Sequence, residues 1–344
     1  METNKKSSLL KKILTILISL AFAALFMWLA VRGLDFKNIK ASLVKANYFW
    51  VLAAMVFGLL AYWFRAIRWN LLLEPMGYQI SNSNSLWTIS FGYLMNLTIP
   101  RSGELARSTA LYGVEKVPVD KSFGTIILER VVDLVCMLGF LVLTVLFKKE
   151  AILTFYEKSG IKFNPNFLIG ILIVLIIGSF LFFKFKDKFV HLPFIGKIIV
   201  FIEGIFHGLA TIFKLKQKGK FILLSIAIWV SYYMAAYLVC FALPETSHFT
   251  IADGFFVIVV GTLGMMVPAS GGIGAYHFAM KLGIGALFFS DGSTFEQGAE
   301  IGLSYAFISH TLQLFIMLTM GLISIPMLAK ARNEAVNSTK IQNN

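Results

Sequence analysis

The chain has 344 residues, of which 58% are hydrophobic and only 14% are charged. Soluble domains carry about 25% charged residues, so this composition excludes an ordinary soluble protein. The formal net charge is +13. In a chain this apolar, we assign most of that charge to loops that set membrane orientation, and we expect no nucleic-acid partner. Cys136 and Cys240 lie in apolar stretches and the histidine spacing matches no zinc motif, so we expect neither disulfides nor a metal site.

Six apolar stretches approach or exceed the roughly 20 residues that cross a bilayer. They lie near 13–31, 49–73, 121–147, 167–184, 221–243 and 300–328. The first follows lysines, as in a signal peptide, but no small-residue cleavage site comes after it, so we expect an uncleaved helix. Residues 1–328 are predicted to form a single transmembrane domain, with 189–219 as a cytoplasmic amphipathic segment and 329–344 as a disordered cytoplasmic tail.

Two further apolar stretches are predicted to be hairpins. The first runs from about 84 to 113 and turns at Pro100 to Gly103, and the second runs from about 251 to 289 and turns at Pro268 to Gly272. The second arm of the first hairpin is too short to cross a bilayer, which indicates a re-entrant hairpin. The arms of the second are either half-spans or whole spans. The predicted fold class is thus an all-α polytopic membrane protein.

The distribution of lysine and arginine predicts the orientation. With the N-terminus inside, the cytoplasmic segments hold about twice as many of these residues as the outer segments. We therefore expect a multi-pass protein of the cell (inner) membrane with both termini in the cytoplasm. In this orientation the first hairpin enters from the cytoplasmic side and the second enters from the outer side.

The two predicted turns resemble each other. The first reads "IPRSGEL" at 99–105 and the second reads "VPASGGI" at 267–273. Each hairpin also lies between one span with aromatic residues at its middle and another span. Matched units that enter from opposite faces are typical of transporters built from inverted repeats, whose sites lie near the midplane at interrupted helices. We interpret 49–147 and 221–328 as the two halves.

Several charged residues fall within the apolar segments, where they usually mark a site, a pathway or a mutual pair. Arg65 and Arg68 are three apart and share a helix face; they either form part of a site or extend to the headgroups. Arg101, Glu104 and Arg107 follow a period of three and would form one stripe if a helix begins after Pro100. Internal pairing would leave this stripe with one positive charge.

Glu129 and Asp133 are four apart on one helix face, with Arg130 beside them. These carboxylates could hold a metal, relay protons, or act as counterions for arginines of neighbouring helices; we favour the ion pairs. The whole cluster contains five arginines and three acids. The arginines are Arg65, Arg68, Arg101, Arg107 and Arg130, and the acids are Glu104, Glu129 and Asp133. A buried site with surplus positive charge suits an anionic group such as phosphate.

The second turn contains no arginine. Its glycines could let backbone N–H groups approach an anion at a helix start, or they could simply permit close helix packing. An enzyme is the competing interpretation, because "ASGG" with the later His310 suggests a serine protease of the membrane. The usual first glycine of that motif is replaced by Pro268, and a serine and histidine must lie within hydrogen-bond reach. We therefore expect no enzyme and no catalytic residue.

Four segments in this order, "RAIRWNLLL", "NLTIPRSGELAR", "ILERVVDL" and "VPASGGIGAYH", resemble the flippase-like membrane family typified by the N-terminal half of bacterial lysyl-phosphatidylglycerol synthase. The resemblance covers nearly the whole chain. It implies a helical bundle that binds or moves anionic lipids between leaflets, such as phospholipids or polyprenyl-phosphate-linked intermediates. The aminoacyl-transferase domain does not follow the last span, so we do not expect lysine transfer.

The predicted function is translocation of an anionic lipid, without a cofactor and without an ATP site. The alternative is a non-transporting lipid-binding subunit or scaffold of a glycosyltransferase or envelope complex, and the protein partner would then be such an enzyme or another copy of the chain. The candidate substrate-binding residues are Arg65, Arg68, Asn96, Pro100, Arg101, Ser102, Gly103, Glu104, Arg107, Glu129, Arg130, Asp133, Pro268, Ser270, Gly271, Gly272 and Gly274.

Overall fold

The computed structural model describes residues 36–99, 101–160 and 215–342, together with parts of the stretch 14–32. The predicted span 167–184 and nearly all of the predicted amphipathic segment lie outside the described residues, as does Pro100. Throughout the described ranges the chain is helical or turns, with no strand. The all-α class is therefore confirmed.

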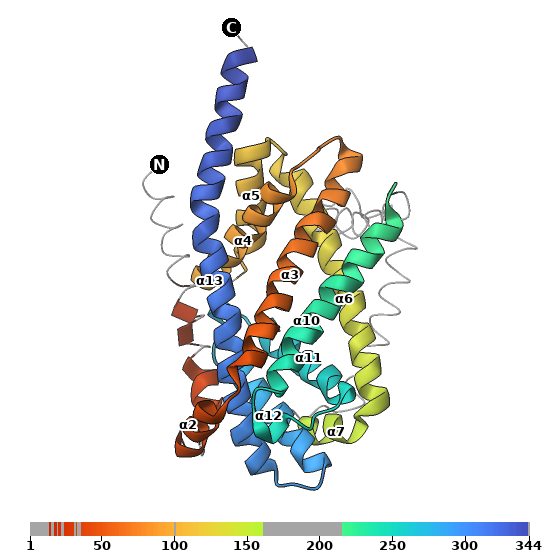
Figure 1. Ribbon diagram of the computed structural model, residues 1–344, viewed down its shortest axis with the longest axis vertical. Coiled ribbons are helices and arrows are strands. Elements are labelled where there is room, and N and C mark those ends of the chain that lie inside the picture. The colour runs from red at the N-terminus through yellow and green to blue at the C-terminus, as the bar shows by residue number, and fades with distance from the viewer. Residues whose placement is uncertain are drawn as a thin grey trace, which may run out of the picture.

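The helices follow one another with short connections (Figure 1). In chain order they are α2 (Phe36–Lys45), α3 (Tyr48–Leu73), η1 (Glu74–Met76), α4 (Asn82–Thr98), α5 (Gly103–Glu115), α6 (Val119–Phe147), α7 (Lys149–Lys158), α10 (Lys218–Cys240), η2 (Pro244–Thr246), α11 (Ile251–Met266), η3 (Ser270–Gly272), α12 (Ala275–Ser290) and α13 (Phe295–Gln342).

Five stretches of helix in the described part of the chain are long and apolar enough to cross a membrane. Three of them, α3, α6 and α10, lie where the sequence predicts the spans 49–73, 121–147 and 221–243, and α13 contains the predicted span 300–328. The fifth stretch runs over Ser270–Ser290 and joins the turn η3 to α12, which by itself has 16 residues. The other hairpin arms are helices of 13 to 17 residues.

Local sequence signals account for several helix boundaries. The side chain of Asn47 accepts a hydrogen bond from the N–H of Phe49 at the start of α3, and Thr250 and Asp253 form a capping box at the start of α11. The end of α5 is marked by Lys116, which adopts a left-handed conformation with φ 57°.

The two hairpins occupy opposite halves of the bundle. Figure 1 shows α4 and α5 in its upper half and α11 and α12 in its lower half. Their tips meet, because the side chain of Arg101 donates a 3.1 Å hydrogen bond to the carbonyl oxygen of Met266, at the end of α11. Leu97 of α4 also lies against Gly271 in the second turn. The inverted-repeat interpretation requires this placement, and the repeat itself stays a prediction.

One predicted segment differs in the structure. The tail 329–344 was expected to be disordered, but α13 continues to Gln342. The stretch after Leu328 contains no glycine or proline, and its first seven residues, "AKARNEA", are nearly all residues that favour helix. Lys330 and Glu334 also form an i,i+4 pair at 4.0 Å. A polar composition alone therefore does not end this helix.

Candidate functional site

Two arginines of α3 bind two carboxylates of α6 inside the bundle. Arg65 contacts Asp133 at 2.8 Å, and Arg68 contacts Asp133 at 2.9 Å and Glu129 at 3.4 Å. All four side chains are buried. The i,i+3 spacing on one helix and the i,i+4 spacing on the other place each pair on the facing surface. The interpretation of these residues as mutual counterions is confirmed, and extension of the arginines to the headgroups is wrong.

Helix α5 of the first hairpin adds a third buried arginine to this network. Arg107 contacts Glu129 at 2.7 Å and its guanidinium lies 3.5 Å from the ring centre of Trp69. The indole N–H of Trp69 donates a 2.9 Å hydrogen bond to Thr125 of α6. Arginine stacks well on aromatic faces because its charge is delocalised over a plane. The network therefore holds α3, α5 and α6 together.

Arg130 forms the accessible edge of the same network. It contacts Glu104 of α5 at 2.9 Å and Asp133 at 3.8 Å, and 45% of its side chain is exposed. Arg65, Arg68 and Arg107 are by contrast almost fully enclosed. Arg130 is thus the member of the cluster that a ligand can reach without opening the protein.

The network contains more donors than acceptors. Four arginines face three acids, and among the described residues four buried guanidinium nitrogens have no hydrogen-bond partner: Nε of Arg65, Nε of Arg68, and Nε and Nη2 of Arg107. On the acceptor side, Oε2 of Glu129 is also without a hydrogen bond, although it forms the 2.7 Å ion pair with Arg107. A buried polar group without a partner typically costs about 1–3 kcal/mol. An additional acceptor, such as a phosphate oxygen, would suit this surplus of charge and of donors.

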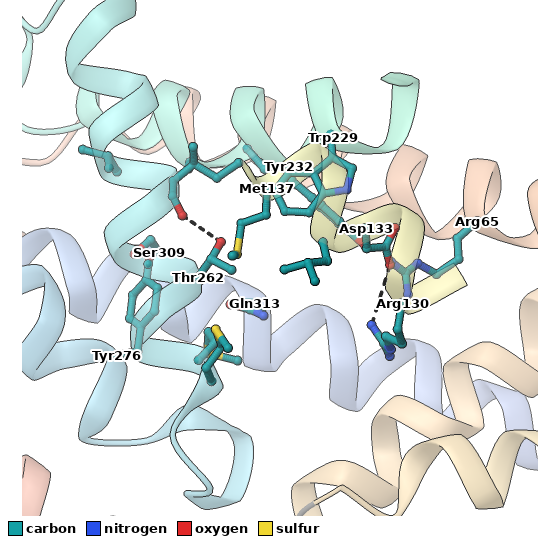
Figure 2. Close-up of a pocket in the computed structure, with 18 of the residues that line it drawn as sticks. Arg65, Arg130, Asp133, Met137, Trp229, Tyr232, Thr262, Tyr276, Ser309 and Gln313 are labelled. Atoms are coloured by element: carbon teal, nitrogen blue, oxygen red, sulfur yellow. Dashed lines mark hydrogen bonds and ion pairs between the residues drawn. The ribbon is translucent and has the colours of Figure 1, made fainter. Parts of the chain in front are cut away.

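A cavity of about 510 Å³ begins at the network and continues between α6, α10, α11 and α13. Figure 2 shows Arg65, Arg130 and Asp133 on one side of it and Thr262, Tyr276 and Ser309 on the other. Its volume falls within the range of small-molecule sites. Apolar side chains of methionine, leucine, isoleucine, valine and alanine separate the two polar sides. The cavity is therefore charged at one end and neutral at the other.

Arg101 does not join the carboxylates. Its side chain extends to the second hairpin, where it contacts the carbonyl oxygen of Met266, and its backbone adopts φ 60°. The expected stripe of three residues is incomplete for this reason: Glu104 and Arg107 both lie on α5, whereas Arg101 lies in the turn before the helix starts at Gly103. The cluster around the cavity thus has four arginines rather than five.

Three predicted site residues of the first turn shape the backbone. Asn96 accepts a 2.7 Å hydrogen bond from the N–H of Gly103, and the hydroxyl of Ser102 donates to the carbonyl of Ile99 at 2.7 Å. Gly103 lies so close to α4 that an added Cβ would overlap the carbonyl oxygen of Gly92. These residues hold the hairpin closed and place Glu104 and Arg107 in the network.

The second turn is also held by its own contacts. Gly271, Gly272 and Gly274 all have positive φ values, of 60°, 77° and 80°, which favour glycine. The N–H of Gly272 donates to the carbonyl of Ala269 at 3.0 Å, so this N–H group is not available to bind an anion. Ser270 is buried in the same turn, and Pro268 precedes it.

His310 takes part in the structure of the second turn. Nε2 of His310 lies 2.8 Å from the carbonyl oxygen of Gly271, and because a carbonyl can only accept, this nitrogen carries the proton and donates it. A catalytic base must accept a proton from the serine hydroxyl, so the protease interpretation would require Nδ1, which has no hydrogen-bond partner among the described residues.

Several residues that line the cavity were not predicted from the sequence as site residues. They are Tyr93, Trp229, Thr262, Tyr276, Ser309 and Gln313. Gln313 carried a usable signal, because it is an amide within the apolar stretch 301–328. The aromatic residues did not, since tyrosine and tryptophan are common at membrane interfaces and in helix cores.

The fold and this site define a polytopic membrane protein with an arginine–carboxylate network inside the bundle. Residues 16–321 match the lysylphosphatidylglycerol synthase TM region family, and the chain belongs to this family. It is 24% identical over 191 residues to the UPF0104 membrane protein MJ1595 of Methanocaldococcus jannaschii, covering 55% of this chain and 54% of that protein. It is 23% identical over 305 residues to the glycosyltransferase AglD of Haloferax volcanii, covering 79% of this chain and 49% of that protein.

The chain thus spans about half the length of the relatives it matches. No solved structure matches it. These relationships establish a membrane protein related to lipid handling, and they leave the activity to be argued from the site.

Proposed function

We propose that this protein binds an anionic lipid in the cavity and moves its headgroup between the two leaflets. The observation that supports this proposal most strongly is the excess of arginines over carboxylates in a network whose Arg65 and Arg130 line one end of a cavity of lipid-headgroup size. Phosphate is the anionic group common to membrane lipids, and paired guanidinium groups are its usual ligands in proteins. Arg130 and Arg65 would bind it first, since both line the cavity.

A lateral path from the bilayer supports the same proposal. Two apolar residues that line the cavity are strongly exposed, Leu134 of α6 at 49% and Met266 of α11 at 56%, so we take this edge of the cavity to be open to the bilayer. An acyl or prenyl chain could remain in the bilayer at this edge while the headgroup enters between α6 and α11. Intramembrane polar sites of transporters lie in such protein-lined cavities at interrupted helices.

One observation favours a second function. The relative named as a glycosyltransferase is matched over 49% of its length, so a membrane region similar to this chain occurs within a protein of that name. We therefore keep the alternative of a non-transporting lipid-binding subunit for a glycosyltransferase. The two functions differ in one measurement, because a subunit of this kind would bind the lipid without accelerating its exchange.

Reconstitution into liposomes tests the proposed transport. The purified protein should speed transbilayer exchange of a labelled anionic phospholipid, and Arg130→Gln should slow that exchange by about tenfold, the loss of roughly 1.4 kcal/mol from one charge-assisted contact. Arg332→Gln is the matched control, because Arg332 is exposed near the end of α13. This variant should exchange lipid at the wild-type rate. An absence of acceleration with every anionic lipid tried would overturn the proposal.

We also propose that both termini face the cytoplasm, from the excess of lysine and arginine on that side. Lys121 and Lys149 provide the test, because both are exposed and they lie at opposite ends of α6. After Cys136 and Cys240 are replaced by alanine, a membrane-impermeant thiol reagent applied to whole cells should label Lys149→Cys and leave Lys121→Cys unlabelled. The reverse pattern would invert the topology.

A further inference from the structure

The charges around the cavity distinguish between classes of lipid headgroup. Its ionisable lining residues are Arg65, Arg130 and Asp133, apart from tyrosines. Asp133 already binds Arg65 at 2.8 Å, Arg68 at 2.9 Å and Arg130 at 3.8 Å. Among the residues that line the cavity, no carboxylate is therefore left for a positively charged group.

The far end of the cavity offers neutral hydrogen-bonding groups. Ser309 and Tyr276 are joined by a 2.9 Å hydrogen bond between their hydroxyls, and the amide of Gln313 faces the same space, as Figure 2 shows. On the side of Asp133, as Figure 2 shows, the indole N–H of the buried Trp229 has no hydrogen-bond partner among the described residues. The hydroxyl of Ser309 already donates to the carbonyl of Tyr305 at 2.9 Å and therefore accepts the hydrogen bond from Tyr276, so both hydroxyls are left to accept. The amide of Gln313 can donate and accept, and together these groups suit a ligand that carries hydroxyl groups.

Aromatic faces could in principle bind a cation, and here they are partly covered. The ring of Tyr276 stacks on His310 with 5.0 Å between centroids, and Trp229 stacks on Phe140 at 5.7 Å. The guanidinium of Arg65 already lies 5.9 Å from the centre of the Tyr232 ring. An ammonium group at these rings would also face Arg65 and Arg130 in a low-dielectric interior, where like charges repel strongly.

From this arrangement we propose that the cavity selects lipids whose phosphate carries a neutral, hydroxyl-bearing headgroup and excludes lipids that carry an amine. This inference rests on the proposed function, since the phosphate is taken to bind at the arginine end. The headgroup would extend from there toward Gln313, Ser309 and Tyr276. Glycerol and a hexose are both neutral groups of this kind, and they belong to phospholipids and to glycosylated polyprenyl phosphates, respectively.

Three labelled lipids in the liposome assay test the inference. The first is phosphatidylglycerol, the second is its lysyl ester, which adds amines to the same phosphate and glycerol, and the third is a polyprenyl phosphate that carries a hexose. We expect phosphatidylglycerol or the hexose lipid to exchange at least about tenfold faster than the lysyl ester. One buried like-charge contact between the amine and an arginine of the cavity would produce a difference of this size. Which of the two neutral lipids is faster identifies the source of the headgroup.

The outcomes separate this inference from the proposed function. Exchange of the lysyl ester as fast as that of phosphatidylglycerol would overturn the inference and leave lipid transport standing. If the protein accelerated the exchange of none of the three lipids, the proposed function would be overturned, and this inference with it.

A charge variant gives a second measurement. Gln313→Glu places a carboxylate at the neutral end of the cavity and should narrow the ratio between phosphatidylglycerol and its lysyl ester several-fold. Gln297→Glu is the matched control on the same helix, because Gln297 is exposed and lies outside the cavity; its ratio should equal that of the wild type. A ratio unchanged by Gln313→Glu would contradict the placement of the headgroup near this residue.

Discussion

Replacing Glu129 with leucine is expected to destabilise this protein by about 3–5 kcal/mol. Glu129 is the carboxylate that binds both Arg68, at 3.4 Å, and Arg107, at 2.7 Å. Both guanidinium groups are buried, so they cannot recover their lost partner from water. Thermal unfolding in detergent should show a large fall in the Tm of Glu129→Leu.

Two controls make this expectation specific. Glu104→Gln removes a carboxylate that is 27% exposed and binds only Arg130 among the arginines, so its cost should be about 1 kcal/mol or less, as for partly exposed ion pairs. The double variant Glu129→Leu/Arg107→Met removes one charge of each sign and should recover part of the lost stability. If Glu129→Leu proved as stable as Glu104→Gln, the network would not be what holds α3, α5 and α6 together.

Gly103→Ala should disrupt the first hairpin. A Cβ at this position would overlap the carbonyl oxygen of Gly92 and lie 2.6 Å from Nδ2 of Asn96, and backbone on the facing helix cannot yield as a flexible side chain does. Overpacking of this kind typically costs about 1–3 kcal/mol. Because α5 would be pushed away from α4, Arg107 would also be displaced from Glu129, and lipid exchange should fall along with the Tm.

The matched control lies on the same helix. A Cβ at Gly113 would meet no atom within 4 Å, so Gly113→Ala should leave lipid exchange unchanged. Alanine within a helix is favoured over glycine by about 0.5–1 kcal/mol, and the Tm should therefore rise slightly. Equal losses from both substitutions would contradict the close approach of α4 and α5.

The sequence was sufficient for those features that depend on period and length. Apolar runs located α3, α6 and α10, and the i,i+3 and i,i+4 spacings placed Arg65, Arg68, Glu129 and Asp133 on facing helix surfaces. Helical spacing could not show the path of Arg101, because this residue lies in a turn with positive φ. The direction of its side chain depends on the second hairpin, which is distant in the sequence.

The neutral half of the cavity was beyond sequence reasoning for a similar reason. Ser309 and Gln313 are four apart on α13, but Tyr276 joins them only through the packing of α12 against α13, and each residue is ordinary in a membrane helix when considered alone. Charged residues in lipid are rare and therefore noticeable. Tyrosine, serine and glutamine become informative only once their neighbours are known.

The pairing of α3 with α6 has a consequence for biogenesis. Glu129 follows Arg68 by 61 positions, so α3 enters the bilayer during synthesis before its counterions exist. An arginine at the middle of an isolated helix opposes membrane insertion by about 2.5–3.5 kcal/mol; the two arginines of α3 lie in its last third, where the cost of each is smaller. The apolar first two-thirds of this helix must therefore carry it into the lipid, and the nascent chain reaches a settled arrangement only after α6 has emerged and neutralised it.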